Sequence, residues 1–112
     1  MRDRKVHLRA SLERLTEAWA PETVAHVNDY DVRVAKLHGT YHWHRHGDTD
    51  ELFLCLRGGL IIQLRDPVRE VVLTEDELYV VPRGVEHRPI AHEEAHVLLF
   101  EPRTTDPAGD PP

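Results

Sequence analysis

The sequence predicts an all-β fold with a short N-terminal helix, on three observations. From residue 24 the chain breaks into short runs rich in Val, Leu, Ile and Tyr, which is the composition of β-strands. Turn signals such as Gly58-Gly59 and Pro82-Arg83-Gly84 separate these runs. No helix is expected between them, and a succession of short strands indicates an antiparallel barrel or sandwich. The predicted strands are Val24–Asn28, Val32–His38, Tyr41–His46, Leu52–Leu56, Leu60–Arg65, Glu70–Leu73, Tyr79–Val81 and Ala95–Glu101.

Residues 5–19 are expected to form the helix, because three leucines and Trp19 recur at spacings of four, three and four residues. Ala20 and Pro21 end it, since a residue that precedes proline is disfavoured in the helical region. A helix of this length is marginal alone and must dock on another part of the protein.

The predicted organisation is a helical arm over residues 1–20, a barrel over residues 21–102 and a flexible tail over residues 103–112. From Pro102 onward the chain holds four of its eight prolines and no large apolar group to bury. Within the barrel, Gly58-Gly59 is expected to close a β-hairpin, because both positions tolerate a positive φ.

The composition limits the classes of function. A net charge of −6 without a basic stripe argues against nucleic-acid binding. The longest apolar run, Leu52–Leu56, is far shorter than the roughly 20 residues of a membrane helix. We recognise no signal peptide, so we expect a cytoplasmic protein with no membrane partner. The single cysteine, Cys55, is interpreted as a small buried thiol rather than a nucleophile.

Nine histidines in 112 residues point to metal or proton chemistry. If Tyr41–His46 is a strand, then His42, His44 and His46 lie on one face of it. Two imidazoles two residues apart on a strand can share a metal ion. Glu51 follows after a four-residue turn, which brings its carboxylate back beside this face.

A fourth candidate ligand, His87, follows Pro82 and Gly84 in a turn that aims it from the opposite side of a barrel. Three imidazoles and one carboxylate without a thiolate suit a divalent transition metal, namely Fe, Mn, Zn, Ni or Co.

The same residues resemble the two motifs of the cupins, a family of small antiparallel barrels. The first motif, G-x5-H-x-H-x(3,4)-E-x6-G, is matched from Gly39 to Gly58 with one residue fewer after the first glycine. The second, G-x5-P-x-G-x2-H-x3-N, is matched from Pro82 to His87, with Asp76 and Ala91 replacing its first and last residues. The resemblance covers roughly residues 24–101.

The resemblance implies a cupin-like antiparallel β-barrel, or jelly roll, with a ligand pocket at its mouth. It implies that the metal ligands are His44, His46, Glu51 and His87. His42 is outside the motifs and is interpreted as a substrate contact, a donor to a ligand or a spare ligand. Trp19 and Trp43 are interpreted as packing residues rather than substrate-stacking residues.

Three functions are compatible with these patterns. The first is a metal-dependent enzyme of oxygenase, isomerase, lyase or cyclase type on a small organic molecule, with His42 or Glu86 as a candidate proton shuttle. The second is a non-catalytic binding or sensing barrel with the metal as its polar anchor. The third is a small barrel in which the metal only stabilises the fold and no ligand is bound. We also expect a homodimer, because small cupins often dimerise through their N-terminal segments.

Overall fold

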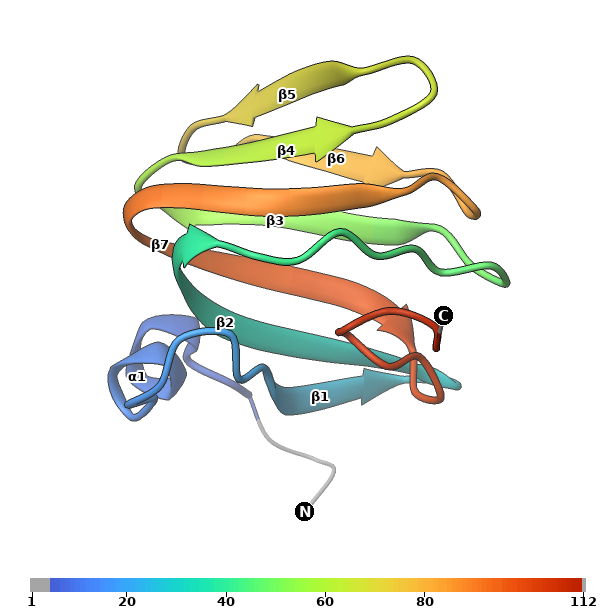
Figure 1. Cartoon of the computed structure of the whole chain (residues 1–112). Helices are drawn as coiled ribbons and strands as arrows, with labels where there is room; N and C mark the ends of the chain where they lie inside the picture. Colours follow the sequence, from blue (N-terminus) through green and yellow to red (C-terminus); the bar gives the residue numbers. More distant parts are fainter. Residues whose placement is uncertain (1–4, 112) are drawn as a thin grey trace.

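Residues 5–111 are described by the computed structural model, and they form seven β-strands and one short helix (Figure 1). The elements are α1 (Leu8–Glu13), β1 (Glu22–Val27), β2 (Tyr30–Thr40), β3 (Glu51–Arg57), β4 (Leu60–Leu64), β5 (Arg69–Leu73), β6 (Leu78–Val81) and β7 (His87–Pro102). All the strand pairs are antiparallel, which confirms the predicted all-β class with a short N-terminal helix. No helix within residues 5–111 is long and apolar enough to span a membrane.

Strand β7 organises the sheet because it pairs with three other strands. Its first residues, His87–Ile90, pair with β4, and its second half pairs with β2 on one side and β3 on the other. The end of β2 also pairs with Ile90 and Ala91. Figure 1 shows the ribbon of β7 curving around one end of the barrel between these two parts. The strand order β1-β2-β7-β3-β6, with β4 and β5 joined to the first part of β7, wraps the strands around one interior.

Inward-facing side chains of β2, β3, β4 and β7 fill this interior. On β4 the alternate residues Leu60, Ile62 and Leu64 are fully buried, as expected for a strand with one face on a core. Burying one such side chain contributes about 1.5–3 kcal/mol to the free energy of unfolding. Cys55 is fully buried in the same core, which agrees with its interpretation as a small buried thiol.

Helix α1 ends at Glu13, so the helix predicted over residues 5–19 is too long. Contacts with Lys36 of β2 replace the missing helical turns. The Lys36 ammonium donates to the Leu15 carbonyl at 2.8 Å, and the Lys36 carbonyl accepts the Trp19 N–H at 2.9 Å. Trp19 itself has a φ of +62°, a left-handed conformation that no right-handed helix contains.

The predicted strand Tyr41–His46 is wrong, because this segment pairs with a neighbour at one residue only. His44 forms an isolated antiparallel bridge to His87, with N–O distances of 2.9 and 2.8 Å. The predicted single face of three histidines is also incomplete, since His44 and His46 are buried whereas His42 is exposed. Residues 41–50 are therefore a loop, called the ligand loop below, that is attached to β7 by this bridge and by a hydrogen bond from the Tyr41 N–H to the Pro89 carbonyl at 3.1 Å.

Gly58-Gly59 does not close a hairpin, because β3 and β4 pair with β7 and not with each other. Gly58 has a φ of +83°, and a Cβ there would lie 2.9 Å from the carbonyl oxygen of Glu94. The two glycines thus carry the chain closely past the curved part of β7, from one part of the sheet to the other.

Charged side chains are buried where β2 and β7 meet. The Arg33 guanidinium donates to Glu101 at 2.7 Å and to Asp31 at 3.3 Å, and all three residues are buried. Its remaining hydrogen bonds go to the carbonyl oxygens of Arg103 and Thr105. Arg33 therefore ties β7 to β2 and to the chain that follows β7.

The tail predicted to be flexible is hydrogen-bonded to Asp29 at its start and to the ligand loop at Ala108 and Asp110 (Figure 1). Backbone hydrogen bonds hold this segment, and composition does not reveal them. The predicted boundaries of the arm, the barrel and the tail stay predictions.

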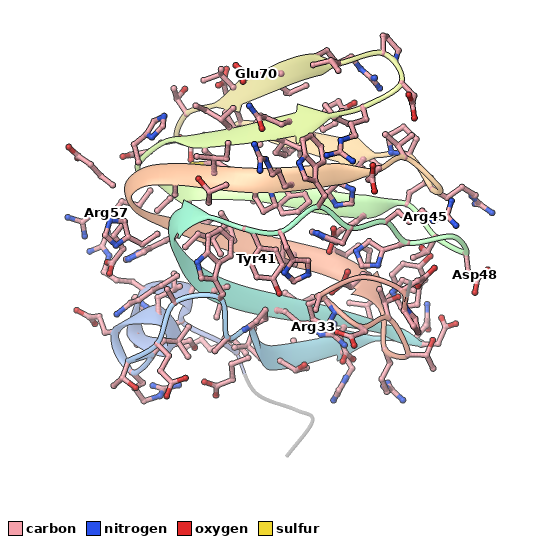
Figure 2. The ribbon with its side chains drawn as sticks, viewed as in Figure 1. Arg33, Tyr41, Arg45, Asp48, Arg57 and Glu70 are labelled. Atoms are coloured by element: carbon pink, nitrogen blue, oxygen red, sulfur yellow. The ribbon has the colours of Figure 1, made fainter. Side chains whose placement is uncertain are left out.

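We expect Arg33→Ala to lower the free energy of unfolding by about 3–5 kcal/mol, because it removes the buried cation that contacts both Glu101 and Asp31. The control is Arg57→Ala, since Arg57 is exposed and projects from the barrel (Figure 2). The control should stay within about 0.5 kcal/mol of the parent. Urea unfolding followed by circular dichroism measures the free energy of unfolding of both variants. A decrease of under about 1 kcal/mol for Arg33→Ala would contradict the prediction, since a solvent-exposed ion pair contributes that much.

Candidate metal centre

The bridge between the ligand loop and β7 places two of the candidate ligands face to face. The backbone groups of His44 and His87 donate to each other in both directions, so their side chains emerge from one point of the structure. Their ring centroids lie 4.4 Å apart. His46 follows two residues later, where its carbonyl accepts the Gly84 N–H at 2.8 Å.

Glu51 enters the same space as the first residue of β3. The chain between His46 and Glu51 turns back in four residues, and the Asp50 carboxylate fixes that turn by accepting the Arg83 N–H at 2.8 Å. Glu51 is then held in the ladder opposite Val81 of β6. The carboxylate that the sequence placed beside the histidines thus arrives there through strand pairing.

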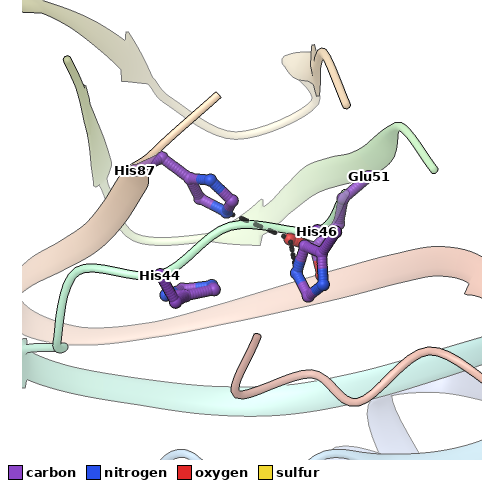
Figure 3. Close-up of side chains that lie close together, drawn as sticks. All are labelled: His44, His46, Glu51 and His87. Carbon is purple, nitrogen blue, oxygen red and sulfur yellow. Dashed lines mark hydrogen bonds and ion pairs between the residues drawn. The ribbon is translucent and has the colours of Figure 1, made fainter. Parts of the chain in front are cut away.

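Four side chains converge at this point: His44, His46, Glu51 and His87 (Figure 3). Each offers one ligand atom, and these atoms all lie within 4.8 Å of one another. The Oε1 atom of Glu51 is 3.2 Å from Nε2 of His46 and 3.3 Å from Nε2 of His87. All four residues are buried, with exposed fractions from 1% for Glu51 to 7% for His44. This cluster could hold a metal ion.

Two of the imidazoles are oriented by their own backbone. The Nδ1 atom of His44 lies 2.9 Å from the His42 carbonyl oxygen, and that of His87 lies 2.9 Å from the Val85 carbonyl oxygen. A carbonyl can only accept, so Nδ1 carries the proton in both rings. The lone pair is therefore on Nε2, the atom that faces the cluster. A hydrogen bond from the other ring nitrogen to a backbone carbonyl is usual for metal-binding histidines.

His46 shows why these residues fit a metal ion. Its ring is buried, yet within residues 5–111 neither ring nitrogen makes a hydrogen bond. A buried polar nitrogen without a partner is costly, and a ligand bond to a cation removes that cost for the nitrogen that makes it. Three neutral imidazoles and one carboxylate form the nitrogen and oxygen donor set that first-row divalent metals take.

Burial and mutual contacts shift the ionisation of the cluster. Burial lowers the pKa of His44 to about 4, so this imidazole stays neutral at ordinary pH. Burial also acts on His46, but the Glu51 carboxylate outweighs it and raises the pKa of His46. Against its own burial, the His46 and His87 rings beside its carboxylate hold the pKa of Glu51 well below its usual range. The cluster thus contains a fixed negative charge.

A pocket opens directly onto two members of the cluster. His44 and Glu51 line it together with side chains that are almost all apolar or aromatic. The other lining residues are Trp19, Pro21, Leu37, Tyr41, Phe53, Pro89, Val97, Leu99 and Pro107. The Trp19 and Tyr41 rings stack at a centroid distance of 4.6 Å and an interplanar angle of 23°. The cluster therefore has one dry, aromatic side.

The two candidate proton shuttles lie outside this pocket. Nε2 of His42 is exposed near the Ala108 carbonyl oxygen, 2.9 Å away. Glu86 forms an ion pair with Arg65 in a separate polar hollow. Their proposed role is untested, and neither side chain lines the pocket beside the cluster.

Both tryptophans pack as the sequence interpretation expects, and one of them also lines the pocket. Trp43 packs as expected, with the Arg65 guanidinium 3.8 Å from its ring centroid. Trp19 also packs against the core, and in addition it forms a wall of the pocket next to Tyr41. The sequence gives no signal that Trp19 lines a pocket, because its left-handed backbone conformation cannot be predicted from the spacing of apolar residues in a helix.

The model of the Cupin domain family matches residues 31–101, a span that includes all four candidate ligands. The uncharacterized protein YdbB of Bacillus subtilis is 33% identical in an alignment of 105 positions that covers 85% of this chain and 92% of that protein. The solved cupin-2 domain containing protein from Shewanella frigidimarina is 38% identical, with a TM-score of 0.84 over 88% of this chain and 94% of that one. The resemblance to cupins is confirmed.

A more distant likeness is to an enzyme. The structure of hydroquinone 1,2-dioxygenase PnpCD in complex with Fe3+ has a TM-score of 0.75 and 14% identity, over 87% of this chain and 32% of that one. At this identity the likeness concerns the fold alone.

We expect His46→Ala to weaken the binding of Co2+ by at least about 100-fold. Mutating a residue that only orients a metal ligand typically lowers metal affinity by about 10–100-fold, and the loss of a ligand itself should cost more. Titration followed by the Co2+ absorption bands measures the affinity. The control is His92→Ala, an exposed histidine of β7 that should leave the affinity unchanged. Equal affinities of the two variants would contradict the assignment of His46.

We also expect metal affinity to fall as pH decreases through the raised pKa of His46. A metal ion displaces the proton of an imidazole, so affinity should drop about tenfold per pH unit once His46 is protonated. His44, with a pKa of about 4, should not contribute above pH 5. Co2+ titrations at several pH values between 8 and 5.5 give the slope, and an affinity independent of pH would refute the prediction.

Proposed function

The chain belongs to the cupin domain family, and from this premise we propose that it is a metal-dependent enzyme acting on a small organic molecule. The observation that carries the proposal is the position of His44 and Glu51, which belong both to the ligand cluster and to the pocket wall. A metal that only stabilised the fold would not need a pocket next to its ligands. The chemistry belongs to the oxygenase, isomerase, lyase or cyclase type.

The four ligands of this proposal are His44, His46, Glu51 and His87, and the ion is a divalent Fe, Mn, Zn, Ni or Co. When bound in six-coordinate geometry, such an ion supplies Lewis-acid or oxygen-binding chemistry at positions that the protein leaves open. Glu51 supplies the negative charge of the ligand set. His44 and His87 present their Nε2 lone pairs in a fixed orientation, because their Nδ1 atoms are bound to backbone carbonyls.

The pocket wall favours a substrate that is small, flat and largely apolar. Among residues 5–111, no Lys or Arg lines the pocket, so within this part of the chain only the metal position pairs with an anionic group. The stacked rings of Trp19 and Tyr41 offer an aromatic surface, while Phe53 and Leu99 keep water away from the reacting side. The fold likeness to a hydroquinone dioxygenase is compatible with a ring-shaped substrate.

One observation favours the alternative, a non-catalytic binding or sensing barrel with a metal anchor. Tyr41 is the one ionisable side chain of the pocket wall, among the described residues, that is not a candidate ligand. Burial, and to a lesser degree the charges of Asp106 and Glu51, raise the pKa of Tyr41, so it can donate a proton only weakly. A binding barrel needs no acid or base beside the metal, whereas isomerase and lyase chemistry do. The predicted homodimer and cytoplasmic location stay predictions.

The two functions are separated by adding azide and then a neutral phenol, such as hydroquinone, to the metal-loaded protein. An open metal position predicts that azide changes the Co2+ absorption spectrum and that the phenol weakens the azide effect. Product formation with Fe2+ under air, followed by mass spectrometry, supports the enzyme. Phenol binding without turnover, across the metals named above, would support the binding barrel. A spectrum that azide leaves unchanged would count against both.

A matched pair of aromatic variants tests the pocket. Trp19→Ala should weaken phenol binding by about 2–12-fold, the range expected for one lost aromatic contact. Trp43→Phe is the control, because Trp43 contacts Arg65 and Arg88 outside the pocket and should leave the affinity unchanged. Equal effects of both variants would show that the phenol binds elsewhere.

A further inference from the structure

The chain that follows β7 does not leave the barrel. After Pro102 it turns twice, with hydrogen bonds from the Thr105 N–H to the Pro102 carbonyl and from the Gly109 N–H to the Asp106 carbonyl. It then runs back toward the ligand loop (Figure 1). We call residues 103–110 the strap.

Both ends of the strap are fastened by polar contacts. At its start, Arg33 donates to the carbonyl oxygens of Arg103 and Thr105 at 3.1 and 3.0 Å. At its end, the Asp110 N–H donates to the Arg45 carbonyl at 2.8 Å, and the Asp110 carboxylate accepts the Gly47 N–H at 2.7 Å. These last two contacts are with the ligand loop, on either side of His46.

Between its ends, the strap lies on the candidate metal centre itself. Gly109 is buried, and a Cβ at this position would clash with the Cβ of His44 and lie 3.0 Å from two of its ring atoms. Gly109 also has a φ of +99°, which favours glycine. Pro107 of the strap lines the pocket opposite His44, Glu51 and Trp19. The strap is therefore one wall of the pocket.

With the strap in place, the pocket is too small for an organic substrate. The space open to a water-sized molecule is about 30 Å³, which is room for one or two waters. A ring compound requires several times that volume. One wall must therefore move before such a molecule can reach His44 and Glu51.

The strap is the wall that moves at the lowest cost. Most of the other wall residues belong to the barrel strands and their core, while the Trp19 and Tyr41 rings stack on each other and their backbone N–H groups donate to the carbonyls of Lys36 in β2 and Pro89 in β7. The strap contributes no large apolar side chain. Its attachment to the ligand loop consists of a few hydrogen bonds at the surface, and segments of this kind open locally far below the free energy of global unfolding.

We propose that the strap is a lid whose opening admits the substrate and whose closed form limits access to molecules of about the size of water. The role in substrate entry rests on the proposed function. The opening itself is a property of the protein without metal and can be tested there.

The test uses metal-free protein and the neutral aromatic probe N-phenyl-1-naphthylamine, whose fluorescence increases in an apolar pocket. Asp110→Ala removes the acceptor for the Gly47 N–H without touching His44. One lost hydrogen bond of this kind should increase the open fraction, and with it the apparent probe affinity, about fivefold. Gly109→Ala, which pushes the strap away from His44, should act in the same direction.

Two controls match these variants. Thr104→Ala changes an exposed residue of the strap, and Gly59→Ala adds a Cβ where no atom lies within 4 Å and φ is not left-handed. Both should bind the probe like the parent protein. Adding Trp19→Ala to Asp110→Ala should reduce the gain, since Trp19 lines the pocket that the probe must enter.

A second measurement needs no variant. Hydrogen exchange of the parent protein should show the Gly109 and Asp110 amides exchanging at least about 100-fold faster than amides of the β2–β7 ladder, because their bonds break when the strap opens. Equal probe affinities in all variants, or strap amides as slow as the ladder, would overturn the lid. If Asp110→Ala binds the probe more tightly but azide and metal tests fail, the lid stands and the proposed function falls.

Discussion

The pair of backbone hydrogen bonds between His44 and His87 is the constraint on which the candidate metal centre depends. The ligand loop has no strand ladder of its own, so this bridge sets where its two buried histidines lie. It also puts the start of β7 beside the loop, and β7 then pairs with β2, β3 and β4. With the hydrogen bond from the Tyr41 N–H to the Pro89 carbonyl, this bridge connects the least regular part of the chain to its most extensively paired strand.

Much of the site follows from local sequence, because the rules that place it are local. Alternation puts His44 and His46 on one side, and the four-residue turn returns Glu51 to them. What sequence does not reveal is whether an alternating segment has a partner, and Tyr41–His46 alternates without a ladder. Gly58-Gly59 has the composition of a hairpin, but the competing partner β7 decides the pairing.

The strap and Trp19 mark the other limit of prediction. Their positions depend on main-chain groups, such as the Arg45 carbonyl and the Lys36 carbonyl, that every sequence possesses. A segment of Pro, Thr, Asp and Gly without large apolar groups is predicted to be flexible from its composition. Composition indicates how much apolar surface a segment can bury, but it does not show which backbone hydrogen bonds the segment makes. Gly109 is informative only once His44 is known to lie against it.

The electrostatic balance of the interior explains why a cation belongs at the cluster. Asp31, Glu51 and Glu101 are buried acids, and Arg33 is the one buried base near them among the described residues that is always charged. Burial and the nearby Glu51 raise the pKa of Glu101, while Glu51 raises that of His46, so without metal the interior takes up protons to offset its negative charge. A divalent ion at Glu51 would supply that charge and bind the free nitrogens of His44 and His87. Buried negative charge destabilises the metal-free protein. The same charge therefore makes the site favour a cation over a neutral occupant.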